Sequence, residues 1–414
     1  MGKGRLCLIW EVGRLDTDMK QAQIFFSILR SVMWGTETEV PAETDWRGVM
    51  NLAARQKCLH AFSVWTKTHR ITTPYDKTLQ PQMFMTMQRQ VRLNHLAADV
   101  ITLLAEHHIP ATLIKGYSLA GLYPDPDTRD FGDVDIYVGE ENYLRAAEIV
   151  TEAFPEAHWH SALHGGIHYI LVIDENLDRV VELHRVTMEM HDRKADALYQ
   201  AFTKKYLSGA ELSSVVWRGV ELPVPPVAYN ALYVFIHAWH HFESTGVGFR
   251  PLADWALCLH DAHEQLSETE WQALCGEIDH ILTALHMKTA WQTFGHVLVK
   301  ALHLPSEFFP LYTDSYQRRA ERLQRQLLRD GHGGRPALFQ KNKVSKFQSF
   351  RGKIQEIALM RRFPWERPER HRVLQVSYTA CKLVYDAWQM GKFFPDLAWH
   401  ELIHSLRLAC TKKH

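Results

Sequence analysis

The chain has no excess of charge of either sign, and this limits the partners that it attracts. Lys plus Arg and Asp plus Glu both number 47 among 414 residues, so the formal net charge is zero. Proteins that bind long nucleic acids do so mostly through positive charge that neutralises phosphates. We therefore expect no nucleic-acid partner, and a small molecule or a protein side chain is the expected target.

Cysteine is scarce, and long apolar runs are missing. The six cysteines are scattered and form no CxxC pair, which excludes a zinc spacing or a disulfide framework and indicates reduced thiols. No apolar run reaches the roughly 18 residues that a membrane span needs. The apolar stretch at residues 7–10 is too short for a signal peptide. We expect a cytoplasmic protein that does not contact a membrane.

The hydrophobic periodicity changes twice along the chain. Helical spacing predicts one helix over 16–34, a second that begins after Asp45 as its N-cap, and a third over 80–107. Shorter patterns then predict a mixed α/β segment. Its expected strands are 111–114, 133–138, 166–173 and 179–184, and its expected helices are 118–123 and 140–154. Beyond about residue 225 the pattern is helical again, with helices expected over 229–242, 250–263, 271–285 and 290–302.

These patterns predict an α+β fold in which helical regions flank a small mixed-sheet core. We expect an N-terminal helical region at 1–108, the α/β core at 109–210 and a C-terminal helical region at 211–414.

Two carboxylates alternate with apolar residues on one predicted strand. Asp133 and Asp135 share one strand face, while Val134 and Ile136 share the other and anchor the strand in a core. Adjacent carboxylates repel each other, and a divalent cation relieves that repulsion. Mg²⁺ is usually held by one or two carboxylates together with substrate phosphates. The pattern therefore indicates a metal site, for Mg²⁺ or Mn²⁺.

A later strand supplies a third acid. In the run 180–184, Glu182 and His184 share one face, and Val181 and Leu183 share the other. If this strand lies beside the first, three carboxylates meet at one sheet edge and suit a two-metal site. His184 then either orients Glu182 by a hydrogen bond or simply packs at the edge.

A glycine upstream of the acids precedes a helix-like segment. Gly116 follows the short apolar run 111–114, which is where a phosphate sits on free backbone N–H groups. The neighbouring Lys115 either neutralises such a phosphate or faces water at the strand end. A phosphate seat beside a metal seat indicates nucleotide chemistry.

Taken together, these motifs resemble the bacterial "uncharacterised nucleotidyltransferase" family of the DNA-polymerase-β-type nucleotidyltransferase superfamily. The matching positions span roughly residues 45–260. They are Asp45-Trp46, Leu113-Ile114-Lys115-Gly116, Leu122-Tyr123-Pro124, Arg129, Gly132-Asp133-Val134-Asp135, Val181-Glu182-Leu183-His184, His237, His241, Gly246, Gly248, Phe249-Arg250 and Asp254-Trp255. The resemblance implies that Asp133, Asp135 and Glu182 bind metal as the catalytic acids. It also implies that Gly116 and Ser118 hold the triphosphate of a nucleoside triphosphate.

Three further residues have two interpretations each. Arg129 either reaches a phosphate or pairs with Asp133. His237, four residues before His241, either contacts the substrate pocket or belongs to a polar helix face, and a third ligand for zinc is not evident. Arg250 either lines the nucleotide pocket or forms a helical ion pair with Asp254.

The expected reaction transfers a nucleoside monophosphate from an NTP to a hydroxyl or amine acceptor, with Mg²⁺. The acceptor is expected to be a small molecule or a protein, and its identity is open. Two alternatives remain: a catalytically inactive nucleotide-binding or interaction module, and a metal-dependent phosphotransferase.

Overall fold

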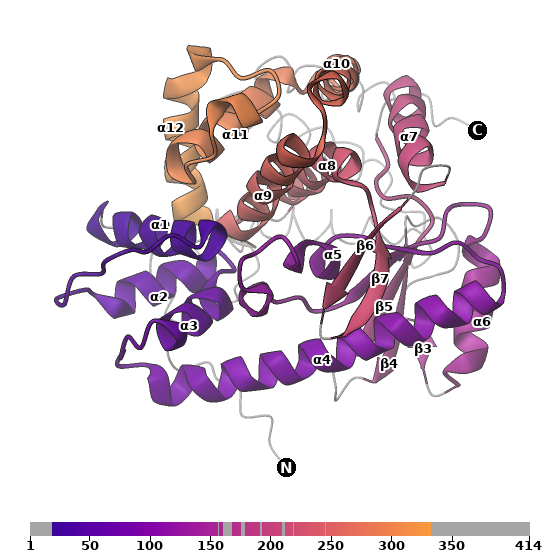
Figure 1. Ribbon diagram of the computed structural model, residues 1–414, viewed down its shortest axis with the longest axis horizontal. Coiled ribbons are helices and arrows are strands. Elements are labelled where there is room, and N and C mark those ends of the chain that lie inside the picture. The colour runs from indigo at the N-terminus through magenta and orange to yellow at the C-terminus, as the bar shows by residue number, and fades with distance from the viewer. Residues whose placement is uncertain are drawn as a thin grey trace, which may run out of the picture.

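The structure is a computed structural model, and it describes residues 19–332 except positions 156, 160–167, 175–178, 191–192, 209–211, 218 and 245. A small sheet surrounded by helices forms an α+β fold, as predicted (Figure 1). The strands are β1 (Thr112–Leu113), β2 (Val134–Tyr137), β3 (His158–Trp159), β4 (His168–Asp174), β5 (Arg179–His184), β6 (Ser213–Trp217) and β7 (Val220–Val224). The α-helices are α1 (Met19–Trp34), α2 (Trp46–Arg55), α3 (Leu59–Thr68), α4 (Asp76–Glu106), α5 (Gly116–Ala120), α6 (Tyr143–Ala153), α7 (Arg193–Leu207), α8 (Val227–Ser244), α9 (Phe249–Gln265), α10 (Glu268–Ala284), α11 (Lys288–Ala301) and α12 (Gln317–Asp330).

The main sheet is mixed, with the order β1-β2-β5-β4-β3. Strands β2 and β5 are parallel neighbours, whereas β1, β4 and β3 each run antiparallel to their partners. The register between β2 and β5 places Asp135 opposite Glu182, and Tyr137 opposite His184. The short strand β3 and the separate β6–β7 hairpin were not predicted from the sequence.

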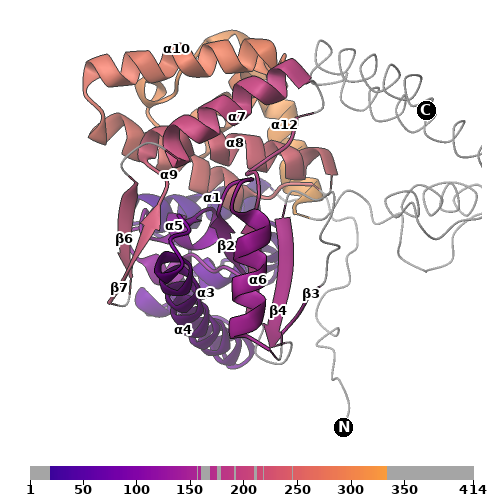
Figure 2. The same cartoon turned by 90° about the vertical axis from the view of Figure 1, so that its right-hand side faces the viewer.

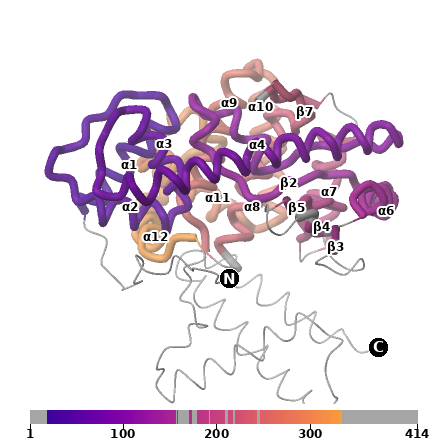
Figure 3. Tube along the Cα trace, turned by 90° about the horizontal axis from the view of Figure 1, so that it is seen from below, coloured from indigo at the N-terminus to yellow at the C-terminus, as the bar shows by residue number. Residues whose placement is uncertain are grey.

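The alternation along β2 and β5 separates an apolar face from a polar one. Val134, Ile136, Val181 and Leu183 are buried in a core that also contains residues of α4 and α6. Helix α4 is one unbroken helix of 31 residues, and it lies across β2 and β5 when the molecule is seen from below (Figure 3). The opposite face of the two strands is therefore the one that carries the acids.

A second core joins the N-terminal and C-terminal helices. Buried side chains of α1, α2 and α3 share one cluster with those of α8 to α12. Figure 2 shows α7, α8 and α10 above the sheet region, with α4 and α6 below them. Asp45 is the N-cap of α2, as predicted, and its carboxylate accepts a hydrogen bond from the Gly48 backbone N–H. In Figure 1, α8 and α9 lie above the sheet and α4 lies below it.

Helices α3, α7 and α12 were not predicted from the sequence. Residues 333–414 lie outside the described part of the chain. The division at residues 108 and 210 stays a prediction. Cys58, Cys258 and Cys275 are free thiols. In the part of the chain that the structure describes, none of the helices combines the length and the apolar character needed to span a bilayer.

Candidate active site

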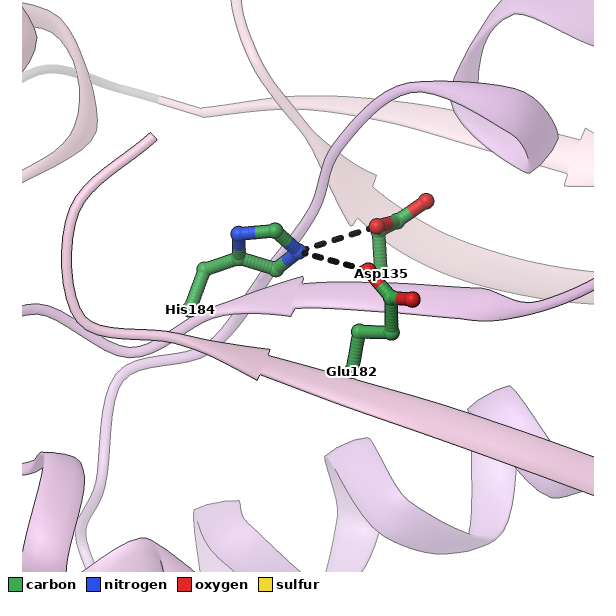
Figure 4. A group of neighbouring side chains, drawn as sticks. All are labelled: Asp135, Glu182 and His184. Carbon is green, nitrogen blue, oxygen red and sulfur yellow. Dashed lines mark hydrogen bonds and ion pairs between the residues drawn. The ribbon is translucent and has the colours of Figure 1, made fainter. Parts of the chain in front are cut away.

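Asp135 and Glu182 lie side by side on the parallel strands β2 and β5. Their register pairing brings both carboxylates to the same sheet face, where His184 joins them from the end of β5 (Figure 4). One potential ligand atom from each of these three residues lies within 4.8 Å of the others. Hard oxygen donors at this spacing suit a divalent cation such as Mg²⁺.

His184 is buried between the two carboxylates. Its Nε2 lies 2.9 Å from Asp135 Oδ1 and 3.6 Å from Glu182 Oε2. The ring therefore donates its Nε2–H to Asp135 and fixes the direction of that carboxylate. This arrangement matches an outer hydrogen-bond partner that orients a metal ligand. The sequence suggested either an orienting hydrogen bond to Glu182 or simple packing at the sheet edge, and in the structure the hydrogen bond goes to Asp135 instead.

Lys115 supplies the positive charge nearest to the acids. Its Nζ lies 2.7 Å from Asp135 Oδ1, and its side chain is 17% exposed. Burial lowers the pKa of this ammonium, but the charges of Asp135, Glu182 and Asp133 outweigh burial and raise the pKa above its usual value. Lys115 and His184 in turn overcome the effect of burial on Asp135 and depress its pKa. A cation thus already interacts with the acids.

The backbone at Lys115 is in an uncommon conformation. Its φ is 58° and its ψ is −140°, a region that residues other than glycine seldom occupy. The Ser118 hydroxyl donates a 2.7 Å hydrogen bond to the Lys115 carbonyl and so closes this turn. Such a strained turn directs the lysine side chain toward the acids. Ser118 is therefore engaged within the loop that the sequence assigned to the triphosphate.

Gly116 makes a close contact with the segment before β2. A Cβ at this position would lie 3.0 Å from the Phe131 Cβ, tighter than ordinary side-chain contacts. The glycine therefore allows the start of α5 to approach the loop that leads to the acids. This packing role exists whether or not a phosphate binds at the same turn.

Asp133 immediately precedes β2 and is more exposed than Asp135. The negative charge of Asp135, together with burial and Glu182, raises the pKa of Asp133 to about 7. Such mutual influence requires the three carboxylates to lie near one another. All three acids that the sequence selected therefore lie in one electrostatic cluster.

Arg129 and Arg250 have partners other than those considered from the sequence. Arg129 donates from Nε and Nη2 to the two carboxylate oxygens of Asp254, both at 2.7 Å, and both side chains are buried. Arg250 donates from Nη1 to Asp130 Oδ1 at 3.0 Å. Both arginines thus connect the segment before β2 to α9, and a phosphate contact by Arg129 would require its buried pair to open.

His237 and His241 lie on α8, and their rings are 4.6 Å apart in an edge-to-face arrangement. Burial, followed by the charge of Lys115, lowers the pKa of His237 well below its usual value. Burial also lowers the pKa of His241, to about 4. Both rings are therefore neutral near pH 7. Within the described residues, metal-binding side chains gather in threes or more only at Asp135, Glu182 and His184, so this pair stays without a third zinc ligand.

Helix α8 also carries a buried tyrosine that the sequence analysis did not single out. Tyr233 lies one turn before His237 and is fully buried. Burial and the charges of Asp135 and Glu182 raise the pKa of its phenol well above the usual value. A tyrosine within an apolar helical pattern is normally a core residue, so no signal in the sequence distinguished it.

Comparisons with known proteins give a family. The model of the family described as "Uncharacterised nucleotidyltransferase" matches residues 42–286, more than half of the chain. A search of the curated proteins finds no match. Among solved structures, the chain is similar to an antigenic nucleotidyltransferase-like protein from Paracoccidioides brasiliensis, with 15% identity over 51% of this chain and 92% of that chain and a TM-score of 0.30. Because that structural similarity is too low to support an argument, the assignment rests on the match to the family's sequence pattern. The chain belongs to the uncharacterised nucleotidyltransferase family.

Proposed function

We propose that this protein is a metal-dependent nucleotidyltransferase that moves a nucleoside monophosphate from an NTP to a hydroxyl or amine acceptor, a small molecule or a protein. The observation that carries the proposal is the pairing of Asp135 with Glu182 in register on parallel strands, with Asp133 beside them. Membership of the family supports the same reaction class.

The residues present fit Mg²⁺. Asp135 and Glu182 offer hard oxygen ligands at a spacing that suits one ion. Asp133 adds a third carboxylate, and the mutual repulsion of the three is the kind that a divalent cation relieves. When bound, the metal supplies charge stabilisation to the phosphates and to the attacking and leaving oxygens. In this proposal His184 orients Asp135 and does not itself need to bind the metal.

The other side chains handle the nucleotide and the proton. Lys115 is the cation best placed for the phosphates, because its ammonium already reaches the acid cluster. Asp133, the more exposed of the two β2 acids, is accessible to the acceptor and suits removal of its proton. Gly116 and Ser118 form the phosphate turn in this proposal. His237 and Arg250 complete the nucleotide pocket from α8 and α9, and Arg129 joins them in this proposal only if its buried pair with Asp254 opens.

Labelled ATP tests the reaction class. The protein is incubated with Mg²⁺ or Mn²⁺ and candidate acceptors, using ATP labelled at the α-phosphate in one series and at the γ-phosphate in another. We expect the α-label to enter the acceptor and pyrophosphate to be released. Transfer of the γ-label instead would establish a phosphotransferase and refute nucleotidyl transfer.

Asp135→Asn is the matching active-site variant. We expect the rate of transfer to fall by at least about a hundredfold, since even outer partners of metal ligands contribute about 10–100-fold. The fold should persist, because the Asn Oδ1 still accepts from Lys115 and His184 and the charges of Glu182 and Asp133 remain near the Lys115 ammonium. Glu221→Gln, on the hairpin strand β7, is the control, because it makes the same carboxylate-to-amide change at an exposed position. Full activity in Asp135→Asn would refute the assignment.

One observation favours a second candidate, a nucleotide-binding module without turnover. The Lys115 ammonium contacts Asp135 at the place where a metal ion would bind. A protein that needed no metal would retain such an ion pair. Calorimetric binding of ATP without release of pyrophosphate, in the presence of Mg²⁺ and a broad acceptor panel, would support this candidate.

A further inference from the structure

The segment that leads into β2 lies outside the strand ladder and is held by side chains. The carbonyls of residues 129–131 accept hydrogen bonds, in turn, from Gln90 Nε2 at 2.9 Å, from Arg250 Nη1 at 3.4 Å and from Arg89 Nη2 at 3.2 Å. Gln90 and Arg89 belong to α4, and Arg250 belongs to α9. Two helices from distant parts of the chain thus hold three successive peptide groups shortly before Asp133.

Gln90 is an unusual residue for its place on α4. Its side chain is fully buried, on the same helix face as Met83 and Ala97. Its Oε1 has no hydrogen-bond partner among the residues that the structure describes, while its Nε2 donates to the Arg129 carbonyl. A leucine would suit this face without burying an unsatisfied oxygen, which lowers stability. The glutamine therefore indicates a role in holding the segment before β2.

Asp133 depends on this segment more than the other two acids do. Those two acids pair in register within the sheet, whereas Asp133 precedes Val134, the first paired residue of β2. Gly132 is exposed, and a Cβ at this position would meet nothing within 4 Å, so neighbouring side chains do not support the chain there. Asp133 therefore lies between a strand that the sheet fixes and the Phe131 carbonyl, which α4 holds.

We propose that Gln90 and Arg89 are positioning residues, which hold Asp133 within the acid cluster and so set the affinity of that cluster for a divalent cation. This inference rests on the proposed function, because it takes Asp133 as one of the metal-binding carboxylates. Both residues act through the backbone of residues 129–131 and need no contact with the metal. Helix α4, which carries none of the acids, thereby contributes to the metal site.

The test is Gln90→Leu in the full chain, with Mn²⁺ alone as the probe and an electron paramagnetic resonance titration as the readout. We expect Mn²⁺ affinity to fall by about tenfold, the lower end of the effect of residues that orient metal ligands. Arg89→Met removes the donor to the Phe131 carbonyl and should act in the same way, whereas Arg89→Lys retains a donor and should bind Mn²⁺ like the parent. Circular dichroism shows whether each variant is folded, and either position alone suffices for the test.

Gln88→Leu is the matched control, because it makes the same change at an exposed position of α4 and should leave Mn²⁺ affinity unchanged. In an Asp133→Asn background, Gln90→Leu should change the affinity by less than about twofold, since the carboxylate through which it acts is gone. A tenfold loss in that background as well, or equal affinity of Gln90→Leu and the parent, would overturn the inference and leave the proposed function standing. A parent protein that binds no Mn²⁺ would overturn both.

Discussion

Replacing Asp254 by Asn should lower the free energy of unfolding by about 3–5 kcal/mol, the usual cost of breaking one partner out of a buried ion pair. Asp254 accepts two hydrogen bonds from Arg129 and one from the Tyr123 hydroxyl, all at 2.7 Å. The side chains of Arg129 and Asp254 are only 6% and 4% exposed. Asn would turn an amide N–H₂ or a single oxygen toward the arginine and leave its charge buried without a counter-ion.

The neighbouring pair of Arg250 and Asp130 is the natural control. Both side chains are about a quarter exposed, at 23% and 25%, and one contact of 3.0 Å joins them. Solvent screens such a pair, so Asp130→Asn should cost about 1 kcal/mol or less. The two variants make the same chemical change in arginine pairs that both join the segment before β2 to α9, and they differ mainly in burial.

Urea unfolding followed by tryptophan fluorescence and circular dichroism measures both variants. A double variant, Arg129→Met with Asp254→Asn, should be more stable than the sum of the two single losses predicts, because the orphaned charge is gone. A loss below about 1 kcal/mol for Asp254→Asn would contradict the structural role of the pair. It would return Arg129 to the role of a phosphate ligand.

Two further predictions concern charge. Lys115→Met should tighten Mn²⁺ binding by at least about tenfold in an electron paramagnetic resonance titration, because a unit charge near 4 Å is worth a few kcal/mol in a protein. The same variant should lower the melting temperature without metal. Equal or weaker Mn²⁺ binding would contradict competition between Lys115 and the metal. The pKa of His241 is lowered from 6.5 to about 4, so the stability due to its neutral ring is complete above pH 6.5 and is lost as the pH falls toward 4. As the pH falls from 6.5 to 4, the free energy of unfolding of His241→Gln should therefore decrease less than that of the parent. Comparing the two proteins separates the effect of this ring from that of Asp133, whose raised pKa changes stability with pH in the opposite direction. Parallel curves of unfolding free energy against pH would refute the lowered pKa of His241.

The sequence predicted the acid face because strand parity is a local property. The alternation of Asp133 and Asp135 with Val134 and Ile136 needs only the period of a strand. The structure buries the apolar pair against α4, as parity requires. Strand parity does not predict which strand pairs with which. The parallel pairing of β2 with β5 depends on a crossover that contains α6, β3 and β4, and it had to be assumed when the sequence was read.

Missed elements share weak local signals. Helix α12 is so polar that its buried stripe is only Ala320, Leu323, Leu327 and Leu328, too sparse to stand out before its packing partner is known. The β6–β7 hairpin is marked mainly by Gly219, whose φ of +80° suits a tight turn. Both elements are stabilised by distant contacts, which outweigh local propensity.

Ion pairing shows the same limit more sharply. The spacing of Arg250 and Asp254 suggests a pair one helical turn apart, and Arg129 lies close in sequence to Asp133. In the structure Asp254 instead binds Arg129, 125 positions away, and Arg250 binds Asp130. Burial explains the exchange: a bidentate contact with Arg129 satisfies both oxygens of a buried carboxylate, which a single exposed helical contact does not.

Tyr229 and Tyr233 show what helical periodicity alone does not distinguish. Both are tyrosines on one face of α8, four residues apart, and the periodicity assigns both to the core. Their difference lies in hydrogen bonding: Thr187 accepts from the first hydroxyl, whereas the second has no partner among the described residues. Which hydroxyl finds a partner is a property of three-dimensional packing, and the local pattern of the sequence does not contain it.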